Sequence, residues 1–326
     1  MLLNIVLLIL GMLLLVKGAD FFVSGSSNIA RAMRIPPLII GLTLVSIGTS
    51  MPEASVSIFG AIRGMNDMSL GNVVGSNIFN TLFILGASSL IIPLVISRDV
   101  KRYDIPIMVG IYVVLMLFAF VITPYKVDVF ESVTLVALFA AYTAFLILRA
   151  KRESKQAASA SAQCELPLGA DSAEKDKSPI WLSIVFAVVG LAGIIFGGDV
   201  VVDSASEIAK ALGMSEALVG LTIVAVGTSL PELVTSVVAS VKKENDIAVG
   251  NVIGSNIFNI LLILGLSSTI SNIVLDGAAL VDLSVMLGSG VAIMLIALCF
   301  KKMGRWQGAL FVLSYAGYLA YIIIRN

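Results

Sequence analysis

Long apolar segments run along almost the whole chain and are separated by short polar turns. Each is about as long as the roughly 20 residues that an α-helix needs to cross the hydrocarbon core of a bilayer. The pattern predicts ten membrane helices, at residues 3–29, 37–62, 70–92, 104–122, 129–149, 180–208, 215–241, 249–270, 279–300 and 306–324. The first lacks the charged start and the cleavage site of a secretory signal. We therefore predict an all-α integral membrane protein.

The ten predicted helices form two groups of five around a polar segment at residues 150–178. This segment is rich in alanine, serine and charged side chains, which is typical of a flexible tether. We expect a first five-helix repeat at residues 1–149, then this linker, then a second five-helix repeat at residues 179–326.

Lysine and arginine residues predict the orientation of the chain in the membrane. If the N-terminus lies outside, most of them fall in the cytoplasmic loops and the linker. The opposite side keeps only Arg63, Lys126, Lys210 and Arg325. Because basic residues favour the cytoplasmic side, we expect a multi-pass cell-membrane protein with extracytoplasmic N- and C-termini and a cytoplasmic linker.

Composition narrows the range of functions. Hydrophobic residues make up 58% of the chain and charged residues 13%, which fits a protein embedded in a lipid bilayer. Lys and Arg total 21, as do Asp and Glu, so no nucleic-acid partner is expected. The lack of histidine excludes Ser-His pairs and His-ligated metals, and Cys164 and Cys299 are too few for a cysteine cluster. We expect no enzymatic activity, no catalytic residue, no cofactor and no obligate protein partner.

Two segments of the chain recur 179 residues further on. GLTLVSIGTSMPEASVSI at 41–58 returns as GLTIVAVGTSLPELVTSV at 220–237, and GNVVGSNIFN at 71–80 returns as GNVIGSNIFN at 250–259. Asp20 and Asp199 are related by the same shift, and we expect them to have a structural or entrance role. Lys17 lies one helical turn before Asp20 and could pair with it. Since five crossings are an odd number, the second copy is inverted in the membrane. Inverted repeats are typical of secondary transporters, whose substrate site lies between the copies.

Both copies place a proline and a glutamate inside a membrane helix. Pro52 and Pro231 lack an N–H, so each should kink its helix and free a backbone carbonyl. A carboxylate at the bilayer centre costs about 2.5–3.5 kcal/mol on insertion scales, so Glu53 and Glu232 need a partner. No lysine or arginine lies near either glutamate in sequence, whereas a divalent cation would neutralise both. The alternative is a pair of protonated, hydrogen-bonded carboxyl groups.

The side chains around the two glutamates offer oxygen atoms and no soft ligand. They are Thr49, Ser50, Ser76, Asn80, Thr228, Ser229, Ser255 and Asn259. Such a set suits Ca²⁺ or Na⁺ better than zinc or copper, and suits Mg²⁺ less well because Mg²⁺ dehydrates reluctantly. The hydroxyls could instead join helices, and the two asparagines could be structural amides.

GTSMPE and GTSLPE, each followed by GN(V/I)xGSNIFN, resemble the alpha-1 and alpha-2 repeats of the cation/calcium antiporter superfamily, in its prokaryotic sodium/calcium exchanger branch. The resemblance covers both repeat cores, and the ten-helix inverted plan extends it to nearly the whole chain. It implies an electrogenic antiporter that exchanges Ca²⁺ for Na⁺ by alternating access, with the first and sixth helices sliding past the remainder.

The resemblance also implies roles for the motif residues. Glu53 and Glu232 would bridge the calcium ion, helped by backbone oxygens of Thr49 and Thr228. The flanking sodium sites and the motif ends would use Ser50, Ser229, Ser76, Ser255, Asn80, Asn259 and the carbonyls of Ser46 and Ala225.

One position departs from part of the family. Some members, including potassium-dependent exchangers, carry Asp where this chain has Asn259. Two formal charges then remain in the centre instead of three, which favours potassium independence. A proton- or potassium-coupled antiporter is the alternative, and a cation channel is a weaker one because channels usually need several subunits to build a pore.

Overall fold

The computed structural model describes residues 1–33, 35–64, 66–122, 125–163, 179–212, 225–275 and 277–325. Nearly all of these residues are helical, and several helices contain π-helical turns, named η. The first half contains α1 (Leu2–Met33), α2 (Pro37–Ile40), η1 (Gly41–Val45), α3 (Ser46–Thr49), α4 (Met51–Ile62), α5 (Asn66–Ile78), η2 (Phe79–Ile84), α6 (Leu85–Ile91), η3 (Val100–Asp104), α7 (Ile105–Leu117), η4 (Phe118–Ile122) and α8 (Val129–Gln163).

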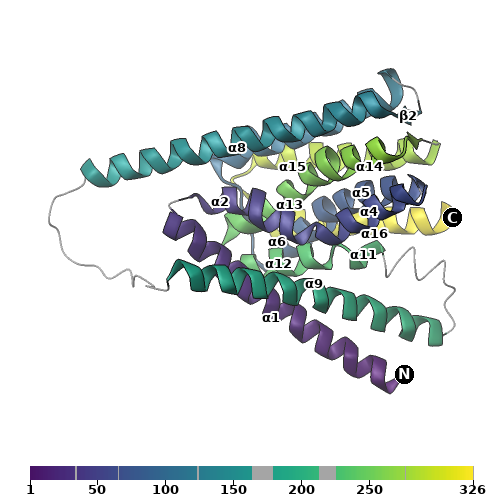
Figure 1. Cartoon of the computed structure of the whole chain (residues 1–326), viewed down its shortest axis with the longest axis horizontal. Coiled ribbons are helices and arrows are strands. Elements are labelled where there is room, and N and C mark those ends of the chain that lie inside the picture. The colour runs from purple at the N-terminus through teal and green to yellow at the C-terminus, as the bar shows by residue number, and fades with distance from the viewer. Residues whose placement is uncertain are drawn as a thin grey trace.

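The second half repeats this order. It contains α9 (Ile180–Ala211), α11 (Ala225–Gly227), α12 (Leu230–Val241), α13 (Asn245–Phe258), η6 (Asn259–Leu264), α14 (Gly265–Ile270), α15 (Gly277–Cys299) and α16 (Arg305–Arg325). The helices run roughly along one axis, with both chain termini at one end of the bundle and the end of α8 and the start of α9 at the other (Figure 1).

The long apolar helices of the described residues agree with the predicted membrane spans. Eight helices are long and apolar enough to cross a bilayer, and Pro37–Thr49 with Met51–Ile62 forms a ninth span that is bent by 50°. Of the tenth predicted helix, 215–241, residues 215–224 lie outside the described residues, and the rest forms α11 and α12.

The predicted end of the fifth helix, residue 149, is wrong. Helix α8 continues to Gln163, so the first part of the predicted flexible linker 150–178 is helical. The added residues are mostly Ala, Lys, Arg, Glu and Gln, which all favour a helix, and this local preference outweighs the polar composition. Residues 164–178, which include Cys164, lie outside the described residues.

The two halves interlock rather than lying side by side. Two short antiparallel strand pairs join them: β1 (Leu94–Val95) with β4 (Lys302–Met303), and β2 (Lys126–Val127) with β3 (Ile273–Val274). In the most apolar 18-residue stretch of the span Asn245–Ile270, 94% is buried. In the corresponding stretch of Leu2–Met33, 22% is buried. The repeated motifs therefore lie at the centre of the bundle, and α1 lies at its edge.

Helices α1 and α9 cross at close range on the outside of the bundle (Figure 1). A Cβ atom added at Gly18 would lie 2.7 Å from the backbone nitrogen of Ile194, and one added at Gly197 would lie 2.7 Å from that of Leu15. Glycine therefore lets the two backbones touch, as small residues do in membrane helix pairs. We conclude that α1 and α9 form one tightly packed unit.

Gly18→Ala should lower the thermal stability of the purified protein. Alanine favours a helix over glycine by about 1 kcal/mol, but overpacking at a closed contact typically costs about 1–3 kcal/mol. Gly110→Ala in α7 is the matched control because nothing lies within 4 Å of its added Cβ. Melting curves of both variants in detergent test this, and equal melting temperatures would contradict the tight contact.

Candidate ion-binding site

The two GTS-x-PE motifs lie where a membrane helix is interrupted. Ser50 (φ −85°, ψ 10°) stands between α3 and α4, and Ser229 (φ −92°, ψ 8°) precedes α12. Each break is followed two residues later by proline, which cannot donate the next backbone hydrogen bond. The expected kink at Pro52 is thus present as the 50° bend, and the chain is interrupted at the corresponding place before Pro231.

Glu53 and Glu232 lie in the first turns of α4 and α12, and neither is exposed to solvent. Each carboxylate accepts a hydrogen bond from the other repeat. The hydroxyl of Ser229 donates to Oε1 of Glu53 over 2.8 Å, and that of Ser50 donates to Oε1 of Glu232 over 2.7 Å. This crossed arrangement brings the two predicted carboxylates into one site.

The serines of the GSN motifs join the same site. Ser76 Oγ lies 3.1 Å from Ser229 Oγ. Ser255 Oγ lies 3.4 Å from Oε1 of Glu232 and also 3.4 Å from the carbonyl oxygen of Ser46. The structure therefore gathers Ser46, Ser76 and Ser255 around the glutamates, as the sequence predicted for their positions.

Four buried oxygen atoms of the site lack a hydrogen-bond partner among the described residues. They are Oε2 of Glu53, Oε2 of Glu232, Oδ1 of Asn80 and Oδ1 of Asn259. A buried acceptor without a partner typically costs about 1–3 kcal/mol. The two carboxylate oxygens are related by the 179-residue shift, as are the two amide oxygens, and both kinds of oxygen are ligands that Ca²⁺ takes. The donor set therefore fits a hard cation.

Asn77 and Asn256 were missed by the sequence analysis, although both are part of the quoted GSN motifs. Asn80 Nδ2 donates to Oδ1 of Asn256 over 3.1 Å, and Asn259 Nδ2 donates to Oδ1 of Asn77 over 3.0 Å. The amide nitrogens of Asn80 and Asn259 are thus engaged across the repeat boundary, which leaves their oxygens for an ion. The same amide orientation occurs in both halves, 179 residues apart.

A second missed pair, Asn72 and Asn251, supports the kinked backbones. Asn72 Nδ2 donates to the carbonyl of Glu53 over 3.1 Å, and Asn251 Nδ2 donates to that of Glu232 over 3.3 Å. The Thr49 hydroxyl lies 3.0 Å from Oδ1 of Asn251 and 3.1 Å from the carbonyl of Val45. The proton of this hydroxyl is therefore used within the protein, and the ligand role of the Thr49 backbone oxygen stays a prediction.

The remaining predicted ligands are placed less fully. Thr228 is half-buried, and its hydroxyl lies 3.5 Å from Oδ1 of Asn72, as the mirror of Thr49 with Asn251. Ala225 is the first residue of α11, and its carbonyl as a ligand stays a prediction.

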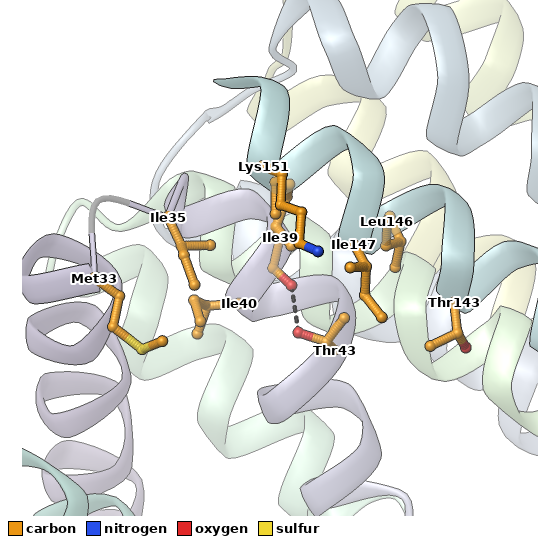
Figure 2. Close-up of a pocket in the computed structure, with 10 residues that line it drawn as sticks. Met33, Ile35, Ile39, Ile40, Thr43, Thr143, Leu146, Ile147 and Lys151 are labelled. Carbon is orange, nitrogen blue, oxygen red and sulfur yellow. Dashed lines mark hydrogen bonds between the residues drawn. The ribbon is translucent and has the colours of Figure 1, made fainter. Parts of the chain in front are cut away.

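Two cavities differ sharply in their chemistry. A cavity of about 630 Å³ between α2, η1 and α8 is mostly apolar, and the Thr43 hydroxyl that faces it already donates to the carbonyl of Ile39 (Figure 2). It holds no carboxylate. A cavity of about 570 Å³ instead touches both motif prolines and is lined by Thr228, Asp199 and Asp203. The second cavity therefore leads toward the carboxylate pair, in agreement with an entrance role for Asp199.

Comparisons with known proteins agree with this geometry. The family model described as "Sodium/calcium exchanger protein" matches residues 3–148 and 182–324. The chain is 33% identical to the sodium/calcium exchanger MaX1 of Methanosarcina acetivorans, over 97% of each chain. It is 37% identical to the inner membrane protein YrbG of Escherichia coli, over 98% of this chain and 97% of that one.

The fold is also similar to a solved one. A structure of the sodium-calcium exchanger NCX_Mj soaked with Na⁺ and Ca²⁺ superimposes with a TM-score of 0.82 at 30% identity, over 98% of each chain. The relatives named as exchangers are transporters, which confirms that the chain is not an enzyme.

Ser229→Ala and Ser50→Ala should each weaken Ca²⁺ binding about tenfold or more. A hydrogen bond to a charged group contributes about 1.5–3 kcal/mol, and each variant removes one that orients a buried carboxylate. Ser284→Ala is the matched control because Ser284 is exposed and its hydroxyl donates to the carbonyl of Leu280 in α15. Calorimetry on the detergent-solubilised protein measures the affinities, and equal affinities in all three variants would argue against the crossed arrangement.

Proposed function

The chain belongs to the sodium/calcium exchanger family, and we propose that it is a secondary active antiporter that exchanges Ca²⁺ for Na⁺ across the cell membrane. The observation that carries the proposal is the pair of buried carboxylates, one from each inverted repeat. Each has one oxygen that accepts a hydrogen bond from the other repeat and one oxygen without a hydrogen-bond partner among the described residues. Glu53 and Glu232 then bridge the calcium ion.

Electrostatics explains why such a site exchanges ions instead of leaking them. With Ca²⁺ bound between two carboxylates the site is neutral, and with several Na⁺ bound it is close to neutral or slightly positive. The empty site keeps two uncompensated charges, which are expensive inside a membrane protein. Only the ion-bound forms of the protein therefore switch readily between facing outward and facing inward. The cycle is electrogenic if the Na⁺ ions carried per cycle have more total charge than the Ca²⁺ ion.

The ligands of the sodium sites come from the hydroxyls and carbonyls around the glutamates. Ser50, Ser76, Ser229 and Ser255 supply hydroxyl oxygens that already contact the carboxylates or each other. The carbonyls of Ser46 and Ala225, and those of Thr49 and Thr228, complete the set in our proposal. No cofactor is required, since the ions are the substrates.

The positions of the chain ends support an orientation with both termini outside. Both termini lie at one end of the bundle, and the linker joins α8 to α9 at the other end (Figure 1). Because basic residues concentrate at the linker end, we assign that end to the cytoplasm. The cavity lined by Asp199 and Asp203 then faces the outside.

Counterflow in proteoliposomes tests the proposed exchange. Radioactive Ca²⁺ uptake should require Na⁺ inside the vesicles. Glu53→Gln should abolish it because the Ca²⁺ ion loses one of the two carboxylates that neutralise its charge. Ser284→Ala should retain uptake, since Ser284 is exposed in α15 and bonds within its own helix. If uptake instead follows an imposed proton or K⁺ gradient, the coupling ion is H⁺ or K⁺ and not Na⁺. Uptake without any counter-ion would indicate a channel.

Asn259→Asp should give Ca²⁺ uptake a new pH dependence. A carboxylate has no N–H to donate to Asn77, whereas a protonated acid can donate as the amide does. The variant should resemble the wild type at low pH and lose uptake as the pH rises and the third charge appears. Asn80→Asp should behave in the same way toward Asn256. Superimposable pH profiles of wild type and variants would contradict this role of the amides.

A further inference from the structure

A basic residue fastens α1 to the end of α12. Lys242 follows the last residue of α12, and its Nζ lies 2.7 Å from Oδ1 of Asp20. The same nitrogen donates to the carbonyl of Asp20 over 2.8 Å and to the hydroxyl of Ser24. The expected pairing of Asp20 with Lys17 is thus replaced by a contact between the two repeats.

The next residues of the same turn add to this contact. The hydroxyl of Ser27 donates to Oε1 of Glu244 over 2.6 Å, and Arg31 lies 3.4 Å from the same oxygen. The turn between α12 and α13 is therefore bound along about three turns of α1. We call this contact the Lys242 clamp.

The 179-residue shift predicts a mirror of this clamp at the other membrane face. It relates Lys242 to Arg63, Asp20 to Asp199, and Ser24 to Asp203. The backbones also match, with φ −75° and ψ 0° at Lys242 and φ −86° and ψ 1° at Arg63.

The residue that follows has positive φ in both turns, 64° at Lys243 and 72° at Gly64. Both turns therefore carry a cationic side chain at the same backbone position.

Only one of the two clamps is formed. In the part of the chain that the structure describes, Arg63 is exposed and has no ion pair, and Asp199 and Asp203 line the cavity of about 570 Å³. Val202 lines the same cavity, whereas its mirror residue, Val23, has no exposed surface. The residues around Asp199 thus border a cavity at the Arg63 end, whereas the matching position beside Lys242, Val23, is fully packed.

We propose that Lys242 and Arg63 are paired positioning residues of the transport cycle, which hold the α1–α9 unit in alternate facing states. Lys242 binds Asp20 in the state described here. When the α1–α9 unit shifts, Lys242 releases Asp20, and Arg63 forms ion pairs with Asp199 and Asp203. The close packing of α1 on α9 makes this reciprocal, because a pull on one helix moves the other. The inference rests on the proposed antiport, which requires two facing states.

The clamp is weak enough to be broken in every cycle. The side chains of Lys242 and Asp20 are 27% and 44% exposed, so water and salt screen their attraction. A partly exposed pair of this kind shifts a two-state equilibrium by up to about fivefold. It therefore biases the facing state without trapping it.

Thiol labelling from either side of the membrane tests the clamp without any ion gradient. In a background with Cys164 and Cys299 replaced by serine, Val202→Cys and Val23→Cys are separate reporters for the two faces. A membrane-impermeant maleimide applied from each side gives the labelling rates. Lys242→Met should raise the rate at the position 23 reporter about fivefold and lower it at the position 202 reporter. Arg63→Met should do the opposite.

Two further variants separate the clamp from a folding defect. Asp20→Asn should reproduce the effect of Lys242→Met, and combining the two should add nothing further. The exchange of the charges, Asp20→Lys with Lys242→Asp, should restore the original rates. The proposal is overturned if Lys242→Met and Arg63→Met shift the rates in the same direction or leave them unchanged. Because labelling requires no coupled transport, a failure of the Na⁺/Ca²⁺ assignment would leave this result intact.

Discussion

Two carboxylates without exposed surface impose the main constraint on this molecule. Glu53 and Glu232 could not remain charged in hydrocarbon, and each is only half satisfied by the protein, through one serine hydroxyl of the other repeat. The second oxygen of each faces no donor among the described residues. The fold therefore has to keep two interrupted helices in register so that a cation can complete both groups at once.

The inverted repeat meets this constraint because each half supplies what the other lacks. Ser50 serves Glu232, Asn256 orients Asn80, and β1 pairs with β4. A single half would leave its glutamate and its amides unsatisfied inside the membrane, where unpaired polar groups are costly. The halves thus depend on each other at the ion site and at both membrane surfaces.

The sequence predicted the elements that follow from strong local patterns. Apolar length predicted the membrane helices, and Pro52 predicted the bend, because neither depends on the tertiary contacts. The meeting of the two glutamates followed from the repeat and its odd number of crossings. The ligand role of each oxygen atom stays a prediction, since the structure shows contacts among the side chains and not the ions themselves.

Other features depend on contacts that a linear pattern does not contain. Asn77 and Asn256 lie in the quoted motifs, but only the folded chain shows that their oxygens engage the nitrogens of Asn259 and Asn80. The partner of Asp20 lies 222 positions away, at Lys242, whereas the nearer Lys17 looked suitable from helical spacing. Helix α8 extends beyond its predicted end because residues that strongly favour a helix follow Arg149.

Some residue pairs related by the 179-residue shift are identical and others are not, and the difference follows from the function of each pair. In the proposed cycle one ion site serves both facing states, so the same ligands have to serve both. Ser50, Glu53, Ser76 and Asn80 are identical to their mirror residues, as this requires. A clamp at one membrane face acts in only one state. Lys242 and Arg63 therefore need a similar charge and side-chain length, but they do not need to be the same residue. In the same way, Ser24 occupies the position that corresponds to Asp203 in the other half. The charged and polar residues of the two clamps can thus differ between the repeats, because they lie at the ends of the path, where the two states need unequal stabilisation.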